Sequence, residues 1–389
     1  MDISKMKINE LAGFSFMCGC GRKHSVDIQK ISVGPDICSE LPLLLAEFRH
    51  KKLFMIADSN TYPIYGEKIY KTLENTRFSL KAHIFPNAGG PLVPDEKAIG
   101  RLLVEIEKDT GMLVAVGSGT INDISRMLSC KMNIPYIIAG TAPSMDGYAS
   151  TVSPLMIDGF KKTFEAVYPY GILGDMEIIR AAPGEMICAG FGDILGKYTA
   201  LSDWQLSRKI NNEYYCETCA ELVRAAIKKC VDNAGGIAAR DPGALSYLME
   251  ALILSGVVMG MAGNSRPASG SEHHLSHYWE IDALARGIEH PLHGNSVGVG
   301  TVIVSHIYEM VKDKYPFDFD LPAPEYIVEQ LKTAGCCSDP KKLGIDRGVF
   351  RSSILHAKEI RPRYTVLHLA EKLGMLGQAA DRLTEMYYG

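Results

Sequence analysis

Short apolar runs alternate with amphipathic stretches along the first half of the chain, a pattern typical of strands that alternate with helices. The strand-like runs are residues 25–33, 52–57, 80–85, 113–116 and 136–139. The helix-like stretches between them are residues 37–49, 65–74, 94–108 and 121–130. Because parallel strands need long, right-handed crossover connections, the pattern predicts an open parallel sheet with helices on both faces.

The pattern changes near Pro183. Residues 141–175 read as loops and short β-like segments, with a hairpin-like excursion at 156–164 that has Lys161 and Lys162 near its tip. Beyond this region, helical periodicity continues nearly to the end of the chain, and the predicted helices are residues 185–207, 212–233, 243–262, 271–286, 297–312, 324–334, 346–357 and 365–388. We therefore expect a Rossmann-like α/β domain at residues 1–182 and an all-α domain at residues 183–389.

Composition excludes several classes of protein. The chain has 389 residues, 47% of them hydrophobic and 22% charged, which is ordinary for a globular protein of two or three domains. A net charge of -4 gives no reason to expect a nucleic-acid binder. Residues 1–12 lack the apolar core of a signal peptide, and the apolar run at 252–262 is shorter than the roughly 20 residues that span a membrane. We expect a cytoplasmic enzyme that does not insert into membranes.

Ten cysteines are scattered along the chain, which favours reduced thiols where no secretion signal is seen. Cys18-Gly-Cys20 and Cys216-Glu-Thr-Cys219 could be combined into a zinc ribbon. The spacing of the first pair is unlike that of a ribbon, and roughly 200 residues separate the two pairs. The expectation is therefore plain thiols, with Cys216 and Cys219 on a helix.

Two glycine-containing loops follow predicted strands, where ligands of parallel sheets bind. They are residues 85–91, with paired glycines, and residues 116–123, Val-Gly-Ser-Gly-Thr-Ile-Asn-Asp. Neither is the Gly-x-Gly-x-x-Gly fingerprint, so each is also compatible with a tight strand-to-helix turn. Asp58, at the end of the second strand, can accept hydrogen bonds from an adenosine ribose, which favours NADH over NADPH, or it can simply open a turn.

Histidines gather where a long apolar run gives way to a polar stretch, residues 264–277. If the chain is helical from Ser271, His273 and His277 lie on one face, one turn apart. A later run, His290-Pro-Leu-His293, offers imidazole from a separate element. Chance clustering of surface histidines is the alternative, but their density favours a metal or proton-transfer site.

Asp193 supplies a carboxylate inside an apolar, glycine-flanked helix, where a charge is costly unless a cation neutralises it. Lys197 is one turn further on, so an ordinary ion pair is one explanation. Together with His273 and His293, however, Asp193 completes a set of two histidines and one carboxylate, the composition of a catalytic divalent-metal site.

These strings carry a resemblance. Gly-x-Gly-Asp-x-x-Gly-Lys, Asn-Ser-Arg-Pro-Ala-Ser-Gly-Ser-Glu-His, His-Gly-x-x-Val-Gly-x-Gly and the upstream Gly-Ser-Gly-Thr-x-Asn-Asp together resemble the sn-glycerol-1-phosphate dehydrogenase family in its bacterial, metal-dependent form. That family belongs to the superfamily of iron-dependent alcohol dehydrogenases, glycerol dehydrogenase and dehydroquinate synthase. The resemblance extends from about Cys18 to beyond Gly300 and implies a dehydroquinate synthase-like architecture, whose helical domain binds metal and substrate.

The resemblance assigns roles to single residues. Asp193, His273 and His293 match the metal ligands, with His274 the nearest rival of His273. The dinucleotide-binding residues that the resemblance implies are Gly89, Gly90, Gly117, Ser118, Gly119, Thr120, Asn122, Asp123, Thr141 and Ser144. Asp58 and Ser150 complete the predicted set. Asp146 matches an acidic residue near the substrate hydroxyls, and His277 a proton-relay or substrate-contacting position.

The implied activity is the reversible reduction of dihydroxyacetone phosphate to sn-glycerol 1-phosphate by NAD(P)H, with NADH favoured, for synthesis of the glycerophospholipid type. Lys197 replaces the histidine that is a fourth ligand in iron-dependent alcohol dehydrogenases, which favours nickel or zinc over iron. Lys197, Arg266 and Lys161 or Lys162 are the candidate phosphate ligands, and Lys197 and His277 the candidate catalytic groups.

The alternatives are a glycerol dehydrogenase that acts on unphosphorylated polyols, a dehydroquinate-synthase-like lyase, and a regulatory protein that only binds metal and nucleotide. A homo-oligomer, dimer or higher, is expected.

Overall fold

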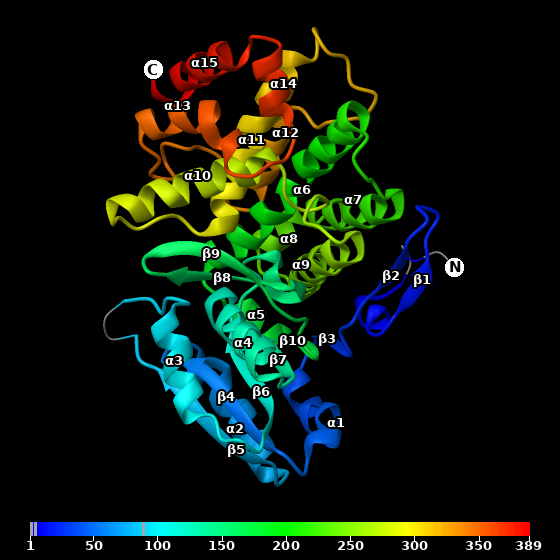
Figure 1. Cartoon of the computed structure of the whole chain (residues 1–389), viewed down its shortest axis with the longest axis vertical. Helices are drawn as coiled ribbons and strands as arrows, with labels where there is room; N and C mark the ends of the chain where they lie inside the picture. Colours follow the sequence, from blue (N-terminus) through cyan, green and yellow to red (C-terminus); the bar gives the residue numbers. More distant parts are fainter. Residues whose placement is uncertain (1–2, 4–5, 88–89) are drawn as a thin grey trace. The chain divides into compact units, whose positions relative to one another are not determined.

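The computed structural model describes residue 3 and residues 6–87 and 90–389. The chain divides into two compact units (Figure 1). The first unit comprises Met1–Phe16 and Lys23–Pro183, and the second comprises Met17–Arg22 and Gly184–Gly389. The main division therefore falls between Pro183 and Gly184, and a short N-terminal segment groups with the second unit.

Six described strands of the first unit form one parallel sheet, in the order β3-β10-β7-β6-β4-β5. Their bounds are β3 Lys30–Gly34, β4 Lys52–Asp58, β5 Ser79–Phe85, β6 Thr110–Gly117, β7 Tyr136–Gly140 and β10 Gly171–Asp175. The helical segments between them are η3 Ile37–Glu40, α1 Leu41–Leu44, η4 Ala46–Phe48, η5 Tyr62–Gly66, α2 Glu67–Asn75, α3 Glu96–Glu105 and α4 Gly119–Met132.

Both faces of the sheet are buried, as the continuous apolar runs of its strands require. On β4, Leu53 and Met55 face a cluster that includes Ile69 of α2, while the intervening Phe54 and Ile56 are buried on the opposite side. Helix α4 packs on β4, β6 and β7. The predicted doubly covered α/β sheet is therefore confirmed.

The order of the strands fixes where a ligand can bind. From β4 the chain moves to β5 on one side, and it then returns to β6 on the other side of β4. This reversal is the switch point at which open α/β sheets bind ligands, beyond the carboxyl ends of the strands. Asp58 ends β4 and Gly117 ends β6, so both residues lie at this edge.

A two-stranded antiparallel hairpin follows the sheet strand β7, after the short η6 Asp146–Ala149. It consists of β8 Val152–Ile157 and β9 Phe160–Glu165, and its turn is formed by Asp158 and Gly159, both with positive φ. Lys161 and Lys162 are strand residues beside this turn and are exposed, in keeping with the predicted hairpin.

The expected single strand at 25–33 is wrong. Residues 23–25 form β2 (Lys23–Ser25), which pairs with β1 (Ser15–Met17), whereas β3 begins at Lys30 and pairs with β10. The two segments have different partners, so a break between them is required.

The second unit is helical apart from the segment Met17–Arg22. After α5 Met176–Ala181 in the first unit, its helices are α6 Gly184–Asn211, α7 Glu217–Val231, α8 Ala234–Ala238, α9 Pro242–Ala262, α10 Ser271–Arg286, α11 His293–Val311, α12 Pro324–Thr333, α13 Arg347–His356, η7 Ala357–Glu359, α14 Val366–Lys372 and α15 Leu376–Tyr388. Helix α9 is long and apolar enough to cross a membrane, but 67% of its most apolar window is buried in the protein, as in a core helix.

Two predicted helices are interrupted in the structure. The helix expected at 212–233 begins only at Glu217, because Asn212 has a φ of 52° that ends the preceding helix. The helix expected at 365–388 is divided into α14 and α15 at Gly374, whose φ is 69°. Positive φ ends an α-helix, and Asn and Gly are the residues that adopt it readily.

Candidate active site

Three side chains from three helices of the second unit converge on one point. Asp193 is in the middle of α6, His273 in the first turn of α10, and His293 is the first residue of α11. One ligand atom of each lies within 4.8 Å of the others, and His273 Nε2 is 3.7 Å from Asp193 Oδ1. The ring centroids of the two histidines are 5.1 Å apart.

Glycines allow the helices to approach closely enough for this convergence. A Cβ at Gly294 would lie 1.8 Å from the carbonyl oxygen of Ala189, and one at Gly192 would lie 2.3 Å from the carbonyl oxygen of Gly294. Backbone atoms of α6 and α11 are thus in direct contact next to Asp193 and His293. The Gly-x-Gly-Asp and His-Gly strings therefore encode a helix crossing as well as candidate metal ligands.

Glu272 orients the ring of His273. Its Oε1 is 2.7 Å from His273 Nδ1 and also accepts a hydrogen bond from the amide of Gly270 at 2.6 Å. Its Oε2 accepts a hydrogen bond of 2.7 Å from Thr199 Oγ1. With Nδ1 directed at this carboxylate, Nε2 of His273 is the nitrogen that faces Asp193.

Burial shifts the pKa values of both Glu272 and His273. Burial raises the pKa of Glu272 to about 7, with a further contribution from the nearby Asp203. Burial, with the positive charge of Lys197 next, lowers the pKa of His273 well below its usual value. A neutral imidazole is the form that binds a metal ion.

A second buried carboxylate, Asp203, holds the start of α10 in place. It accepts hydrogen bonds from Ser271 N at 2.7 Å, Ser271 Oγ at 2.6 Å, Tyr308 OH at 2.7 Å and Val366 N at 2.7 Å. Burial raises its pKa, while these hydrogen bonds oppose the change. By capping α10 at its first residue, Asp203 fixes the turn that carries His273.

Lys197 lies one turn after Asp193, and its Nζ donates a hydrogen bond to Asp193 Oδ1. Both side chains are buried. The ion pair that the sequence left open as an explanation is therefore present, together with the two histidines. Lys197 places a positive charge beside the candidate ligands and is not itself a candidate ligand.

His277 lies on the same face of α10 as His273 and is also close to His293 of α11. Its ring centroid is 6.2 Å from that of His273 and 5.5 Å from that of His293. Arg361 Nη2 is 3.2 Å from its Nε2 and donates to it, while Nδ1 is 3.5 Å from Glu280 Oε2. This arrangement places the ring proton of neutral His277 on Nδ1.

His274, the rival ligand, does not join the cluster. It is fully buried, and neither ring nitrogen has a hydrogen-bond partner among the described residues. Burial lowers its pKa to about 3. The geometry thus favours His273, as the position in the motif suggested.

Arg266 is placed differently from what its proposed role requires. Its Nε donates to Glu213 Oε1 at 2.8 Å, Nη1 to the carbonyl oxygen of Tyr364 at 3.0 Å, and Nη2 to Ser207 Oγ at 3.2 Å as well as to the second oxygen of Glu213. The guanidinium is buried and directed at protein acceptors. These contacts argue against a forked contact with substrate phosphate and favour a structural role.

Two other arginines, which the sequence did not single out, are better placed. Arg361 and Arg363 lie between η7 and α14, and Arg361 reaches the candidate metal ligands through His277. Within the described part of the chain, neither guanidinium forms a salt bridge with a carboxylate. Burial lowers the pKa of both, that of Arg363 to about 10. Desolvated cations without a carboxylate partner favour an anionic ligand.

In the first unit, the loop from Gly117 to Gly119 makes the tight turn from β6 into α4. A Cβ at Gly117 would lie 2.7 Å from Cβ of Ile121, so only glycine fits there. Ser118 Oγ is 2.6 Å from Ser144 Oγ, which ties this loop to the one after β7. Ser118, Gly119 and Thr120 are partly exposed at the start of the helix, where amides can bind phosphate.

Asn122 and Asp123 face protein groups instead of the loop. Asn122 Nδ2 donates to the carbonyl oxygen of Gly147 at 3.1 Å, and Arg126 Nη1 donates to Asp123 Oδ1 at 2.8 Å. Their side-chain contacts support a role in positioning the residues that follow β7.

The remaining predicted cofactor residues differ in what their side chains do. Asp58 Oδ1 accepts hydrogen bonds from the amides of Asn60 at 2.9 Å and Thr61 at 2.8 Å, so Asp58 does open a turn. Ser150 forms a local turn, in which its Oγ accepts from Val152 N at 3.1 Å. Thr141 is buried beside the β6 loop, where its amide donates to the carbonyl oxygen of Gly117 at 3.0 Å.

Gly90 has a φ of 120°, which only glycine adopts readily, whereas Gly89 lies outside the described residues. Asp146 begins η6 in the first unit. Lys161 and Lys162, the other phosphate candidates, are also in the first unit, on β9.

The cluster of the second unit fits a divalent metal ion. A tetrahedral ion with bonds of about 2.0–2.2 Å to N and O needs ligand atoms about 3.5 Å apart, and His273 Nε2 and Asp193 Oδ1 are 3.7 Å apart. One carboxylate oxygen and two imidazole nitrogens leave coordination positions for substrate oxygens. The helices that carry the ligands are held by backbone contact, so the cluster is preorganised.

Comparisons with known proteins agree with this arrangement. Residues 32–183 match the family described as iron-containing alcohol dehydrogenase. The chain is 35% identical to glycerol-1-phosphate dehydrogenase (NAD(P)+) of Geobacillus stearothermophilus, over 94% of this chain and 98% of that protein. It is 38% identical to the protein of the same name from Halalkalibacterium halodurans, over 75% and 74% of the two chains.

Among solved structures, sulfoacetaldehyde reductase from Bifidobacterium kashiwanohense in complex with NAD+ has a similar fold. Its TM-score is 0.70 at 14% sequence identity, and the match covers 93% of this chain and 98% of that one. The relative from Geobacillus stearothermophilus exceeds 30% identity over nearly the whole chain, and the candidate ligands of the second unit are in place. The chain therefore belongs to the glycerol-1-phosphate dehydrogenase family.

Proposed function

We propose that this protein reduces dihydroxyacetone phosphate to sn-glycerol 1-phosphate with NAD(P)H, in a metal-dependent reaction that supplies glycerophospholipid-type synthesis. The observation that carries the proposal is the convergence of Asp193, His273 and His293 in a protein with curated relatives named for this activity. The same site supports the reverse reaction. NAD(P) as the cofactor agrees with the names of those relatives.

Asp193, His273 and His293 would hold the metal ion, and nickel or zinc suits this set better than iron because Lys197 stands one turn after the aspartate. When bound, such an ion supplies Lewis-acid polarisation of a carbonyl group. Glu272 keeps Nε2 of His273 directed at the site, and Lys197 balances the negative charge of Asp193.

His277 is the proposed proton relay. Its Nε2 accepts from Arg361 and its Nδ1 faces Glu280, so the ring holds a proton at Nδ1 beside the two ligand histidines. Movement of a proton between His277 and the substrate oxygen at C2 fits its position. Asp146 remains a proposed contact of the substrate hydroxyls.

Arg361 and Arg363 are the proposed ligands of the substrate phosphate, in place of Arg266. A phosphate would add a direct ion pair, which neither guanidinium forms with a carboxylate within the described part of the second unit, although the charges of Glu213 and Glu272 act on Arg363. Arg361 would then link the phosphate to His277 by its hydrogen bond.

In the first unit, the amides at the start of α4 would hold the dinucleotide pyrophosphate. Asp58 uses Oδ1 in its own turn, and its carboxylate at the end of β4 supports a preference for NADH through the adenosine ribose. Comparison of the Michaelis constants for NADH and NADPH tests this preference. A homo-oligomer in the cytoplasm is the expected state, and light scattering tests the oligomer.

The test of the function is loss of NADH absorbance with dihydroxyacetone phosphate, followed by analysis of the product with an enzyme specific for sn-glycerol 3-phosphate. We expect NADH consumption and a product that this enzyme does not use. A product that it oxidises, or no net consumption of NADH, contradicts the proposal. The second outcome is the one expected of a lyase that recycles its cofactor.

The test of the phosphate ligands compares Arg363→Met with the exposed Arg351→Gln on α13. One lost charge-assisted hydrogen bond corresponds to about 1.5–3 kcal/mol. Arg363→Met should therefore raise the Michaelis constant for dihydroxyacetone phosphate about 10- to 100-fold, with little change for dihydroxyacetone. An equal rise in the Michaelis constants for both ketones would contradict the assignment of Arg363 as a phosphate ligand. The control Arg351→Gln should change neither Michaelis constant.

A further inference from the structure

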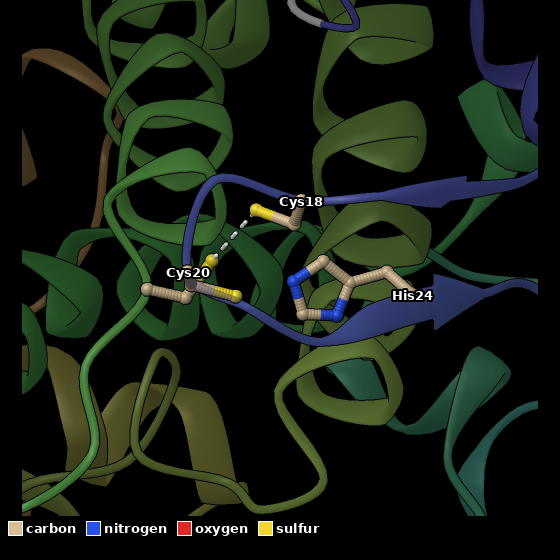
Figure 2. Close-up of side chains that lie close together, drawn as sticks. Cys18, Cys20 and His24 are labelled. Atoms are coloured by element: carbon tan, nitrogen blue, oxygen red, sulfur yellow. Dashed lines mark hydrogen bonds between the residues drawn. The ribbon is translucent and has the colours of Figure 1, made fainter.

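A second group of metal-ligating side chains lies away from Asp193, around the hairpin formed by β1 and β2. Cys18 and Cys20 are in its tip, His24 is in β2, and Cys216 immediately precedes α7. One ligand atom of each residue lies within 4.8 Å of all the others. Figure 2 shows the side chains of Cys18, Cys20 and His24 directed toward one another.

The separation of the sulfur atoms is that of ligands on one ion. Cys18 Sγ and Cys216 Sγ are 3.7 Å apart. Two thiolates bound tetrahedrally to zinc, with Zn–S bonds of about 2.3 Å, have sulfur atoms about 3.8 Å apart. A disulfide would require about 2.05 Å and would leave Cys20 and His24 unused. All ten cysteines are thiols in this structure.

The backbone of the hairpin tip is shaped so that both cysteines face the same way. Cys18 N donates to the carbonyl oxygen of Arg22 at 3.0 Å, and Gly21 N donates to that of Cys18 at 3.0 Å. Gly21 has a φ of 84°, which the tight turn requires. The tip belongs to Met17–Arg22, which packs with the second unit, as Cys216 does, and β2 continues the same hairpin into His24.

Polar and positively charged groups surround the sulfur atoms. Cys216 is the N-cap residue of a 15-residue helix, whose partial positive charge stabilises a neighbouring anion. Tyr214 OH is 3.3 Å from Cys20 Sγ, and Cys18 Sγ donates to Thr218 Oγ1 at 3.4 Å. Arg22 stacks on the ring of Tyr214 at 3.5 Å and adds a positive charge.

Burial separates this group from a chance cluster of surface residues. His24 is 1% exposed and Cys216 is 0% exposed. The strands of the hairpin have three residues each, too few for a two-stranded sheet to be stable without further support. A metal ion shared with the start of α7 would provide that support.

We propose that Cys18, Cys20, His24 and Cys216 form a second metal site, which binds one zinc ion tetrahedrally and fastens the hairpin to the start of α7. Three sulfur ligands and one nitrogen ligand with no oxygen select zinc among common divalent ions. The site is closed and structural, in contrast to the open set around Asp193. The sequence argued against a ribbon built from two cysteine pairs, and in this site His24 replaces Cys219 as the fourth ligand.

The experiment measures zinc in protein purified without chelator and without a metal-affinity step, in an Asp193→Asn background that removes the other site. We expect about one zinc per chain and an X-ray absorption spectrum with three sulfur ligands at about 2.3 Å and one nitrogen at about 2.0 Å. A zinc content no higher than that of the buffer, or a zinc coordination shell of nitrogen and oxygen atoms alone, overturns the proposal. Because activity is not the readout, failure here is distinguishable from failure of the proposed reaction.

Matched cysteine variants identify the ligands. Cys20→Ser, at the partly exposed position, should lose the zinc, whereas Cys219→Ser, one turn after Cys216, should keep it. Loss of zinc from Cys219→Ser but not from His24→Ala would overturn the assignment of His24. If a variant fails to fold, titration of the wild-type thiols with an organomercurial replaces it, and the zinc should be released as three thiols react.

Discussion

At the scale of single residues, the candidate active site depends on groups that hold the ligands as much as on the ligands themselves. Glu272 contacts His273 Nδ1, Gly270 N and Thr199 Oγ1, so one buried carboxylate fixes a ring, a loop amide and a hydroxyl. Groups that orient a metal-binding histidine in this way typically alter metal affinity by 10- to 100-fold when mutated, as an order-of-magnitude guide.

Glu272→Gln should therefore weaken metal binding about 10- to 100-fold while the fold is retained. The amide side chain cannot accept all three hydrogen bonds, so the ring of His273 loses its fixed orientation. Calorimetric titration of metal-depleted protein with the metal ion measures the change in affinity.

Glu309→Gln is the matched control, because Glu309 lies on α11 in an exposed ion pair with Lys312. Metal affinity should be unchanged in this variant. An unchanged affinity in Glu272→Gln as well would show that the carboxylate has no role in orienting His273.

The sequence singles out the candidate ligands but not the groups that contact them. Asp193, His273 and His293 follow from residue type and motif, because few other residues bind metals. Arg361 and Arg363 contact residues more than 80 positions away in the chain, His277 and Ser269, and no local pattern reports such contacts. Arg266 stands in a distinctive motif, yet its partner Glu213 is 53 positions away in the chain, so its structural role was not apparent.

At the scale of elements, the crossing of α6 and α11 sets the geometry of the site. Most predicted helices are present in the structure, but several of their ends differ from the prediction. Asn212 and Gly374 end helices because they adopt positive φ, which the hydrophobic periodicity does not show. Helix α11 also begins at His293, four residues before the predicted start, so this histidine is held by a helix rather than a loop. The apolar pattern predicts which segments are helices, but the glycine contacts determine how close they lie.

Gly294→Ala should separate α6 from α11, because the added Cβ would lie 1.8 Å from the carbonyl oxygen of Ala189, a backbone atom that cannot rotate away. We expect a loss of stability of about 3 kcal/mol or more, together with weaker metal binding. Denaturant unfolding and metal titration measure the two effects.

Gly377→Ala serves as the control, since no atom lies within 4 Å of a Cβ at that position in α15. This change should be neutral or should stabilise the protein by up to about 1 kcal/mol. Equal stability of the Gly294 and Gly377 variants would contradict the close crossing.

At the scale of the whole molecule, the two units carry different parts of the chemistry. The three candidate metal ligands are all in the second unit, and the predicted phosphate-binding loop of the dinucleotide is in the first. The sequence prediction of two domains rests on the alternation of strands and helices before Pro183 and on helices alone after it. The segment Met17–Arg22, which groups with the second unit, could not be predicted, because tertiary contacts alone assign it.

Ligand binding should protect each unit separately from hydrogen exchange. A ligand that binds the native state stabilises the elements that it contacts. Added metal should slow exchange in α6, α10 and the start of α11, and NADH should slow exchange at the end of β6 and the start of α4. Mass spectrometry of peptides measures both patterns. Protection of the β6–α4 peptides by metal alone would contradict this division.

The most direct test of the central claim is a cycle of metal removal and restoration on the whole enzyme. Chelation should abolish the oxidation of NADH by dihydroxyacetone phosphate, and one divalent ion, nickel or zinc, should restore it in the wild type but not in Asp193→Asn. Full activity in protein shown by elemental analysis to lack metal, or restoration of Asp193→Asn to the wild-type rate, would contradict the claim that Asp193, His273 and His293 form the catalytic metal site.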